Sequence, residues 1–194
     1  MLAHRRKNLG FSLVELMITL AVAAILLGLA VPSYREFVQN NRLVSQTNAL
    51  IADLALARSE AVKRAVPVVL CRSSNPSVDP PSCGGAGQTW TTGWLVFVDA
   101  NGDNSYLPAN NDVLLRVGQP APGNLIVMAN ATADAAFGYQ ADGTANAGGN
   151  TGRFAICDDR GESAGRQINI GPVGRPQLVT GVSDAPITNC ANPA

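Results

Sequence analysis

The sequence predicts an α+β fold in which one long N-terminal helix packs on an antiparallel β-sheet or β-sandwich-like head. Residues 11–31 form an apolar run of 21 residues, which is long enough to cross a membrane. Residues 43–61 repeat apolar side chains at three- and four-residue steps, the period of an amphipathic helix. From Pro67 onward, short apolar runs alternate with Gly, Asn, Asp and Pro, which is typical of strands joined by turns.

Residues 1–10 form a basic leader that comes directly before the apolar run. One acid, Glu15, lies near the start of that run. A carboxylate deep in a bilayer costs roughly 2.5 to 3.5 kcal/mol on insertion scales, so Glu15 requires a partner that neutralises its charge. Two simpler interpretations are an ordinary secretory signal, cut after residues 28–30, and a signal anchor. An ordinary signal has a shorter apolar core without an acid, and a plain anchor gives Glu15 no partner.

The predicted helix extends beyond the apolar run and covers residues 11–66. In its second half, apolar side chains share one face and charged side chains occupy the other faces. The apolar positions are Leu43, Leu50, Leu54, Ala57 and Ala61, and the charged positions are Arg42, Asp53, Arg58, Glu60 and Lys63. Gly28 and Pro32 predict a bend or a local loosening between the two halves, and Pro67 ends the helix. We expect the apolar face to pack on the core of the head.

Residues 67–194 are expected to form one compact head domain. The candidate strands are residues 68–72, 90–99, 113–117, 125–129, 136–140, 153–157, 167–170 and 177–180. The segments between them are too short to hold helices, which disfavours a parallel α/β sheet and favours antiparallel pairing. The helix is then expected to lie on this sheet.

Residues 10–15 read Gly-Phe-Ser-Leu-Val-Glu and lead into the apolar run. This combination resembles the class III signal of type IV prepilins and type II secretion pseudopilins. The resemblance implies that a prepilin peptidase in the membrane cuts after Gly10 and methylates Phe11, the new N-terminal residue. It also implies that the helix is retained and that Glu15 pairs with the N-terminal ammonium of a neighbouring subunit during assembly. Such an ion pair is strong because a low-dielectric medium screens it weakly.

Several motifs in the head narrow the family further. They are residues 70–73, 93–103, 114–116, 154–158 and 174–175, together with Cys83 and Trp90. These motifs resemble the GspH/FimT family of minor pilins and pseudopilins. The resemblance implies the pilin fold and a non-enzymatic filament subunit at or near the pilus tip that supports pilus assembly, adhesion, motility or DNA uptake. One alternative is a minor pseudopilin of a type II secretion system, and a second is a DNA-binding tip receptor for natural transformation.

The same resemblance implies where the chain is found and what it contacts. Its partners would be the prepilin peptidase and other pilins or pseudopilins, which it would contact through the N-terminal helix. Before assembly it would be a single-pass protein of the bacterial inner membrane with a periplasmic head. After assembly it would belong to a pilus or a pseudopilus.

The four cysteines, at positions 71, 83, 157 and 190, all follow the apolar run. An even number of cysteines outside the cytoplasm favours disulfides. Four cysteines allow three connectivities, and the sequence does not choose among them. We favour Cys71 with Cys83, which closes a short loop, and Cys157 with Cys190, which ties the C-terminal tail to a core strand.

Arg175 is the residue of the head that we consider first for contact with a nucleic acid. Some FimT-type proteins bind DNA through a Gly-Arg-x-Arg motif, and residues 174–177 read Gly174-Arg175-Pro176-Gln177, so the second arginine is absent. From Pro67 onward the chain has six arginines and ten acids, a balance that disfavours broad binding of polyanions. Arg153, Arg160 and Arg166 would add to Arg175 if the fold gathered them. The alternative is that Arg175 forms a surface ion pair.

The residue types in the head argue against catalysis. The single histidine lies in the leader, and residues 67–194 contain no lysine. General-base and Schiff-base chemistry therefore lack their usual carriers, and we predict no catalytic residue, no cofactor and no metal. Residues 99–105 have the alternating oxygen side chains of a calcium loop, but they lack the glycine and the glutamate that an EF-hand requires. We favour a turn there, with calcium as the alternative.

Overall fold

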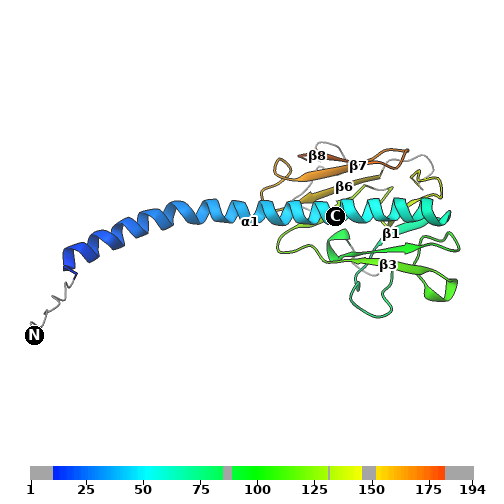
Figure 1. Cartoon of the computed structure of the whole chain (residues 1–194), viewed down its shortest axis with the longest axis horizontal. Helices are drawn as coiled ribbons and strands as arrows, with labels where there is room; N and C mark the ends of the chain where they lie inside the picture. Colours follow the sequence, from blue (N-terminus) through cyan, green and yellow to red (C-terminus); the bar gives the residue numbers. More distant parts are fainter. Residues whose placement is uncertain (1–10, 85–88, 131, 146–151, 182–194) are drawn as a thin grey trace, which may run out of the picture. The chain divides into compact units, whose positions relative to one another are not determined.

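The computed structural model of this chain describes residues 11–84, 89–130, 132–145 and 152–181 (Figure 1). The chain divides into two compact units, Met1–Asn40 and Asn41–Ala194. The predicted leader with Gly10, and Cys190 in the C-terminal tail, lie outside the described residues.

Helix α1 runs from Leu13 to Arg64 and matches the predicted helix to within two residues at each end. It continues through Gly28 and Pro32, where the sequence predicted a bend or a local loosening. Its end is set by Ala65, which adopts a left-handed backbone conformation with φ of 55°. This conformation reverses the chain direction before Pro67, whose ring disfavours helical geometry in the residue before it.

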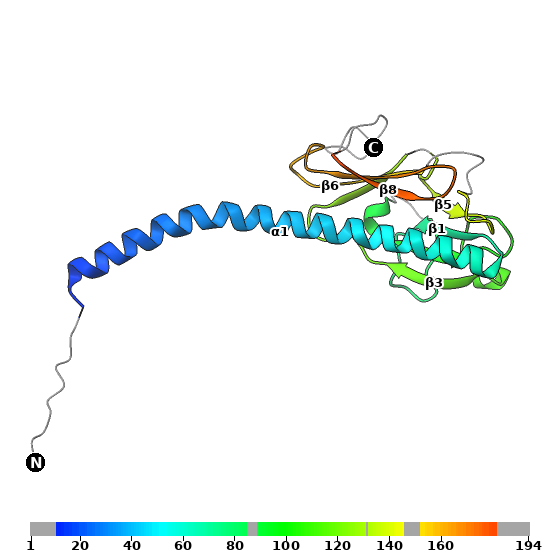
Figure 2. The same ribbon diagram turned by 45° about the horizontal axis from the view of Figure 1, so that its top comes forward.

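The second unit contains two antiparallel four-stranded sheets, whose strands are seen in Figures 1 and 2. The first has the order β3-β2-β1-β5, with β1 at Val68–Arg72, β2 at Trp94–Val98, β3 at Val113–Gly118 and β5 at Ala136–Tyr139. The second has the order β4-β6-β7-β8, with β4 at Ile126–Ala129, β6 at Gly152–Cys157, β7 at Arg166–Ile170 and β8 at Pro176–Thr180. Two 3-10 helices, η1 at Trp90–Thr92 and η2 at Pro108–Asn110, lie in the connections.

The predicted strand over residues 90–99 is wrong in its first part. Trp90–Thr92 form η1, and Gly93 follows with φ of 119°, a conformation that L-residues rarely adopt. The side chain of Trp90 explains the turn, because its indole Nε1 donates to the carbonyl oxygens of Ala133 and Asp134 at 3.1 and 2.9 Å. The other predicted strands agree with the structure to within one residue at each end.

The two sheets and the second half of α1 share one hydrophobic core. Helix residues Leu43, Leu50 and Leu54 belong to the same buried cluster as residues of both sheets. Phe137 on β5 and Phe154 on β6 make an edge-to-face contact across the sheets, with ring centroids 6.0 Å apart. The predicted α+β class is therefore confirmed, with a β-sandwich-like head on which the amphipathic part of the helix packs.

Candidate functional site

The start of α1 carries the residues to which the sequence assigned processing and assembly. Phe11 is 80% exposed and precedes the helix. Ser12 caps the helix, since its Oγ accepts a hydrogen bond from the backbone N–H of Glu15 at 3.2 Å. The sequence reasoning missed this cap, although Ser-x-x-Glu before an apolar run is a known signal of a helix N-terminus. The carboxylate of Glu15 is exposed.

The first unit presents an apolar surface over most of its described length. The exposed large side chains between positions 13 and 31 are Leu13, Val14, Leu16, Met17, Ile18, Leu20, Val22, Ile25, Leu26, Leu27, Leu29 and Val31. This part of α1 is long and apolar enough to cross a membrane. A surface of this kind is stable only against lipid or other apolar helices, because water cannot solvate it favourably.

Asp53 is buried in the second unit, and its predicted position on a charged face of the helix is wrong. The residue is 1% exposed. Its Oδ2 accepts a hydrogen bond from Trp94 Nε1 at 2.8 Å, and its Oδ1 lies 2.8 Å from Nε of Arg116. Burial raises the pKa of Asp53, while the hydrogen bond from Trp94 and the charge of Arg116 act in the opposite direction. Helical spacing could have revealed this burial, because Asp53 lies three residues after Leu50 and four before Ala57, on the buried stripe of α1. Its two partners could not be predicted in this way, because both lie on strands distant in sequence.

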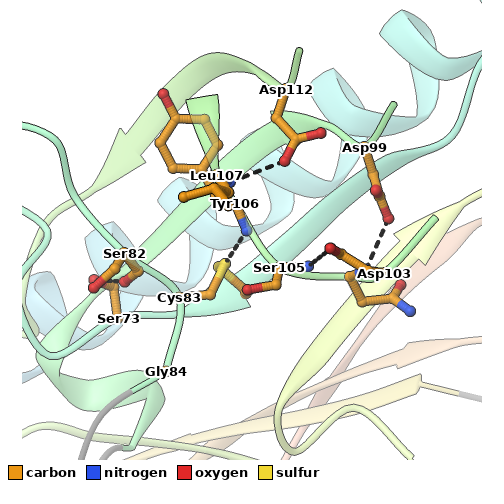
Figure 3. Close-up of a disulfide and its surroundings, with 12 residues drawn as sticks. Ser73, Ser82, Cys83, Gly84, Asp99, Asp103, Ser105, Tyr106, Leu107 and Asp112 are labelled. Carbon is orange, nitrogen blue, oxygen red and sulfur yellow. Dashed lines mark hydrogen bonds between the residues drawn. A yellow bond between two sulfur atoms is a disulfide. The ribbon is translucent and has the colours of Figure 1, made fainter. Parts of the chain in front are cut away.

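The loop after β2 and the first disulfide form one connected region (Figure 3). Cys71 and Cys83 are bonded, which confirms the favoured pairing. Cys83 Sγ also accepts a hydrogen bond from the backbone N–H of Tyr106 at 3.1 Å, so the disulfide contacts the loop. Cys157 is disulfide-bonded as well, but its expected partner Cys190 lies outside the described residues.

The acidic side chains of the loop after β2 accept hydrogen bonds from the loop's own backbone. Asp99 accepts hydrogen bonds from the N–H groups of Gly102 and Asn104 at 2.8 and 3.0 Å. Asp112 accepts from Ala100 and Leu107, both at 2.9 Å. This pattern is that of side chains stabilising a turn. No group of three or more His, Cys, Asp and Glu that could hold a metal ion occurs within the described parts of the chain.

The turn with Gly174 and Arg175 is fastened to the second half of α1. Arg58 donates from Nε to the carbonyl oxygen of Gly143 and from Nη2 to that of Val173, both at 2.9 Å. Gly174 is buried with φ of 75°, and a Cβ at this position would collide with the Gly143 carbonyl oxygen. Backbone packing therefore requires the glycine, whereas Arg175 is exposed.

The structure does not gather the other arginines of the head into one patch. Arg160 pairs with Asp158, with Nη2 and Oδ2 2.6 Å apart. Arg166 on β7 is paired in register with Ile156, so its side chain shares the face of Ile156. Arg153 lies three residues before Ile156 on β6 and therefore points to the opposite face of the sheet.

Comparison with known proteins gives matches over both parts of the chain. Residues 46–174 match the family described as type II transport protein GspH, and residues 5–31 match the prokaryotic N-terminal methylation motif. Two crystal structures of the type IV minor pilin FimU of Pseudomonas aeruginosa have a similar fold. One has a TM-score of 0.55 and 26% identity and covers 74% of this chain and 92% of the FimU chain. The other has a TM-score of 0.52 and 25% identity and covers 71% and 92%.

The chain matches no curated protein. The GspH match includes the helix segment that packs on the head and continues to Gly174 in the turn before β8. The methylation motif includes the leader and the whole apolar run. The chain therefore belongs to the GspH family and carries the N-terminal methylation motif of type IV pilins and pseudopilins.

Proposed function

We propose that this protein is a minor type IV pilin, a non-enzymatic filament subunit at or near the pilus tip. It supports pilus assembly and, through the pilus, adhesion, motility or DNA uptake. The observation that carries the proposal is the likeness to FimU, a type IV minor pilin, over 92% of the FimU chain. The family and the fold are those of structural subunits, so the proposal assigns no reaction to the head.

The N-terminal segment supports a route from membrane to filament. A prepilin peptidase cuts after Gly10, and the mature chain begins with methylated Phe11. The apolar run then holds the protein in the inner membrane until its helix joins those of neighbouring pilins. The exposure of nearly every apolar side chain in this run supports the proposal, because a helix of this kind needs lipid or partner helices along its length.

Intact mass of the protein extracted from membranes tests the processing step. We expect a chain that starts at Phe11 and carries one methyl group. Gly10→Ala should leave most of the protein as uncut precursor. A mature chain that starts at Val31 would contradict the proposal, because that start belongs to an ordinary secretory signal.

The second candidate function is a minor pseudopilin of a type II secretion system. It is favoured by one specific observation, the match of residues 46–174 to the type II transport protein GspH family. The two candidates share processing and membrane insertion and differ in the filament that they enter.

Deletion of the gene in the source bacterium separates the two candidates. A minor pilin predicts loss of surface pili and normal export of secreted enzymes, with the protein present in pili sheared from complemented cells. A pseudopilin predicts the reverse. Unchanged pili together with failed export would overturn the pilin proposal in favour of the second candidate.

A further inference from the structure

Exposed aromatic side chains occur only at the two ends of the apolar run within the residues that the structure describes. They are Phe11, Tyr34 and Phe37, with exposed fractions of 80%, 68% and 62%. The aromatic side chains of the head belong to its hydrophobic clusters and are buried or half-buried. Aromatic rings that contact no core of their own chain therefore border the segment that is able to cross a membrane.

Tyr34 and Phe37 continue the apolar surface of the run past its end. They are three residues apart, so their rings lie on the same side of α1. Val31, three residues before Tyr34, lies on that side as well and is also exposed. The two rings lie between the segments that match known families, residues 5–31 and 46–174. Neither the methylation motif nor the head therefore accounts for them.

The rise of the helix puts the two rings at the surface of a bilayer. From Leu13 to Val31 an α-helix rises about 27 Å, which nearly fills a hydrocarbon core of about 30 Å. Tyr34 lies about 32 Å from Leu13, and Phe37 lies about 36 Å from it. The headgroups extend the bilayer to about 40–45 Å in total. Both rings therefore fall within the headgroup layer on the far side of the membrane.

The residues between the two rings fit the same depth. Arg35 and Glu36 are exposed, and charged side chains are costly in the hydrocarbon core but not among headgroups. The boundary suits Tyr34, because its ring contacts acyl chains while its hydroxyl contacts water and headgroups. Phe37 gains there by burying its ring among the outermost acyl carbons. The surface of a bilayer therefore satisfies the rings and the charges together.

We propose that Tyr34 and Phe37 bind the headgroup–acyl boundary on the periplasmic side of the inner membrane and fix the depth of the helix before assembly. The occupant of this helix face is lipid, because the face is continuous with the membrane-crossing surface and begins where the hydrocarbon core ends. The inference rests on the proposed function, since contact with lipid requires that the apolar run is inserted.

Depth-dependent fluorescence quenching locates position 34. The mature full-length chain carrying Tyr34→Trp is placed in vesicles of phosphatidylcholine and phosphatidylglycerol, at a protein content too low for assembly. The lipids carry a nitroxide on the headgroup, near the top of the acyl chain or at its end. Trp90 and Trp94 are each 1% exposed, and the wild type supplies their background signal. We expect the added fluorophore to be quenched at least about twofold more by the two shallow labels than by the chain-end label.

Variants test whether the rings set the depth of the helix. Leu29→Trp places a fluorophore in the apolar run and reports that depth. Tyr34→Ser with Phe37→Ser removes both rings and keeps Arg35 and Glu36, which favour water. Without the rings, the helix should therefore move outward, and the fluorophore at position 29 should become shallower by about 3 Å, the rise of about two residues.

Two matched variants serve as controls in the same Leu29→Trp chain. Tyr34→Phe with Phe37→Tyr exchanges the rings and should keep the depth. Val62→Ser removes an exposed apolar side chain from α1 in the second unit and should also leave the depth unchanged. In each variant made without Leu29→Trp, unchanged emission from the two tryptophans of the head shows that the head is folded.

Two results would overturn the inference. One is quenching of the Tyr34→Trp fluorophore mainly by the chain-end label, or by no lipid label while Leu29→Trp is quenched. The other is an unchanged depth of position 29 in the double serine variant. If that variant keeps its depth but enters sheared filaments poorly, the rings contact a neighbouring pilin instead of lipid. If no lipid label quenches Leu29→Trp in the otherwise wild-type chain, the apolar run does not enter the bilayer, and the proposed function fails as well.

Discussion

Glu15 combines two roles in one residue, and they can be separated. Its backbone N–H donates to Ser12 Oγ and closes the first turn of α1, while its carboxylate is exposed. Glu15→Ala keeps the N–H and removes only the charge. We expect normal cleavage after Gly10 but at least about tenfold less incorporation into filaments, because the partner ammonium is left unpaired in an apolar medium.

The amount of protein in sheared filaments, relative to the amount in membranes, measures this effect. Glu36→Ala is the matched control, since Glu36 is an exposed acid of the same helix beyond the apolar run. It should incorporate like the wild type. If Glu15→Ala also incorporates normally, the charge has no role in assembly.

Asp53 makes the stability of the head depend on pH in an unusual direction. Burial raises its pKa above the ordinary value of 3.8, so the folded state binds the proton more tightly than the unfolded state. The stabilising contribution is therefore complete at low pH and is lost as the pH rises from about 3.8 through the folded pKa. Relative to Asp53→Asn, the wild type should lose up to about 1.4 kcal/mol of unfolding free energy per pH unit in this window.

Urea unfolding between pH 3 and 7, followed by tryptophan fluorescence, measures this difference. Asp158 provides the contrast. Its burial raises the pKa, but hydrogen bonds and charge from Arg160 outweigh that effect and lower it overall. Relative to Asp158→Asn, the wild type should lose stability as the pH falls through the lowered pKa. Parallel curves for the wild type and Asp53→Asn would show that Asp53 does not titrate differently in the folded state.

At the scale of elements, the turn before β8 depends on one glycine. Gly174 has a positive φ, and a Cβ on it would collide with the Gly143 carbonyl oxygen. Gly174→Ala should therefore lower the free energy of unfolding by about 2 kcal/mol, since it adds a steric clash to backbone strain. Arg58 holds this turn on the helix by donating to the carbonyl oxygen of Val173. Because the added methyl group pushes the turn away from the helix, the variant should also displace Arg175.

Gly171→Ala is the control for this turn. Gly171 begins the same turn, and a Cβ on it would have no atom within 4 Å. We expect a change within about 0.5 kcal/mol, as for other surface substitutions. Equal denaturation midpoints for the two variants would refute the packing role of Gly174.

At the scale of the whole molecule, charge and register together predict weak DNA binding. The arginines of the head are dispersed, and acids outnumber them ten to six beyond Pro67. If Arg175 makes a single phosphate contact, a plot of the logarithm of the duplex-DNA binding constant against the logarithm of the salt concentration has a slope of about −0.9. The mature chain should therefore bind duplex DNA only at low salt, and Arg175→Ala should weaken this binding further.

Gln177→Arg tests whether the fold could support a larger site. Gln177 is paired in register with Asn169, which is paired in turn with Arg153, so these residues share one face of the sheet. The variant should bind DNA more tightly and with a steeper salt slope. Leu178→Arg adds the same charge on the opposite face of β8 and should have less effect. Tight binding by the wild type at physiological salt, lost in Arg175→Ala, would instead make DNA capture the main function.

The sequence by itself determined the elements of this protein and its family. The helix, the positions of the strands and the N-terminal motif are set by local patterns, namely the period of the apolar residues, the turn residues between strands and the order of residues 10–15. The short spacing of Cys71 and Cys83 favoured their bond in the same way, since the loop that it closes is small.

The tertiary structure decided which distant residues meet. The sequence prediction put Asp53 on a charged face, although its spacing from Leu50 and Ala57 is that of the buried stripe of α1. Only the fold brings it to Trp94 and Arg116. The residues at 90–92 suit a strand, but a turn forms because the indole of Trp90 finds its acceptors more than 40 residues away. Such outcomes depend on sheet order and register, which arise from packing of the whole head and leave no signal in a local stretch of sequence.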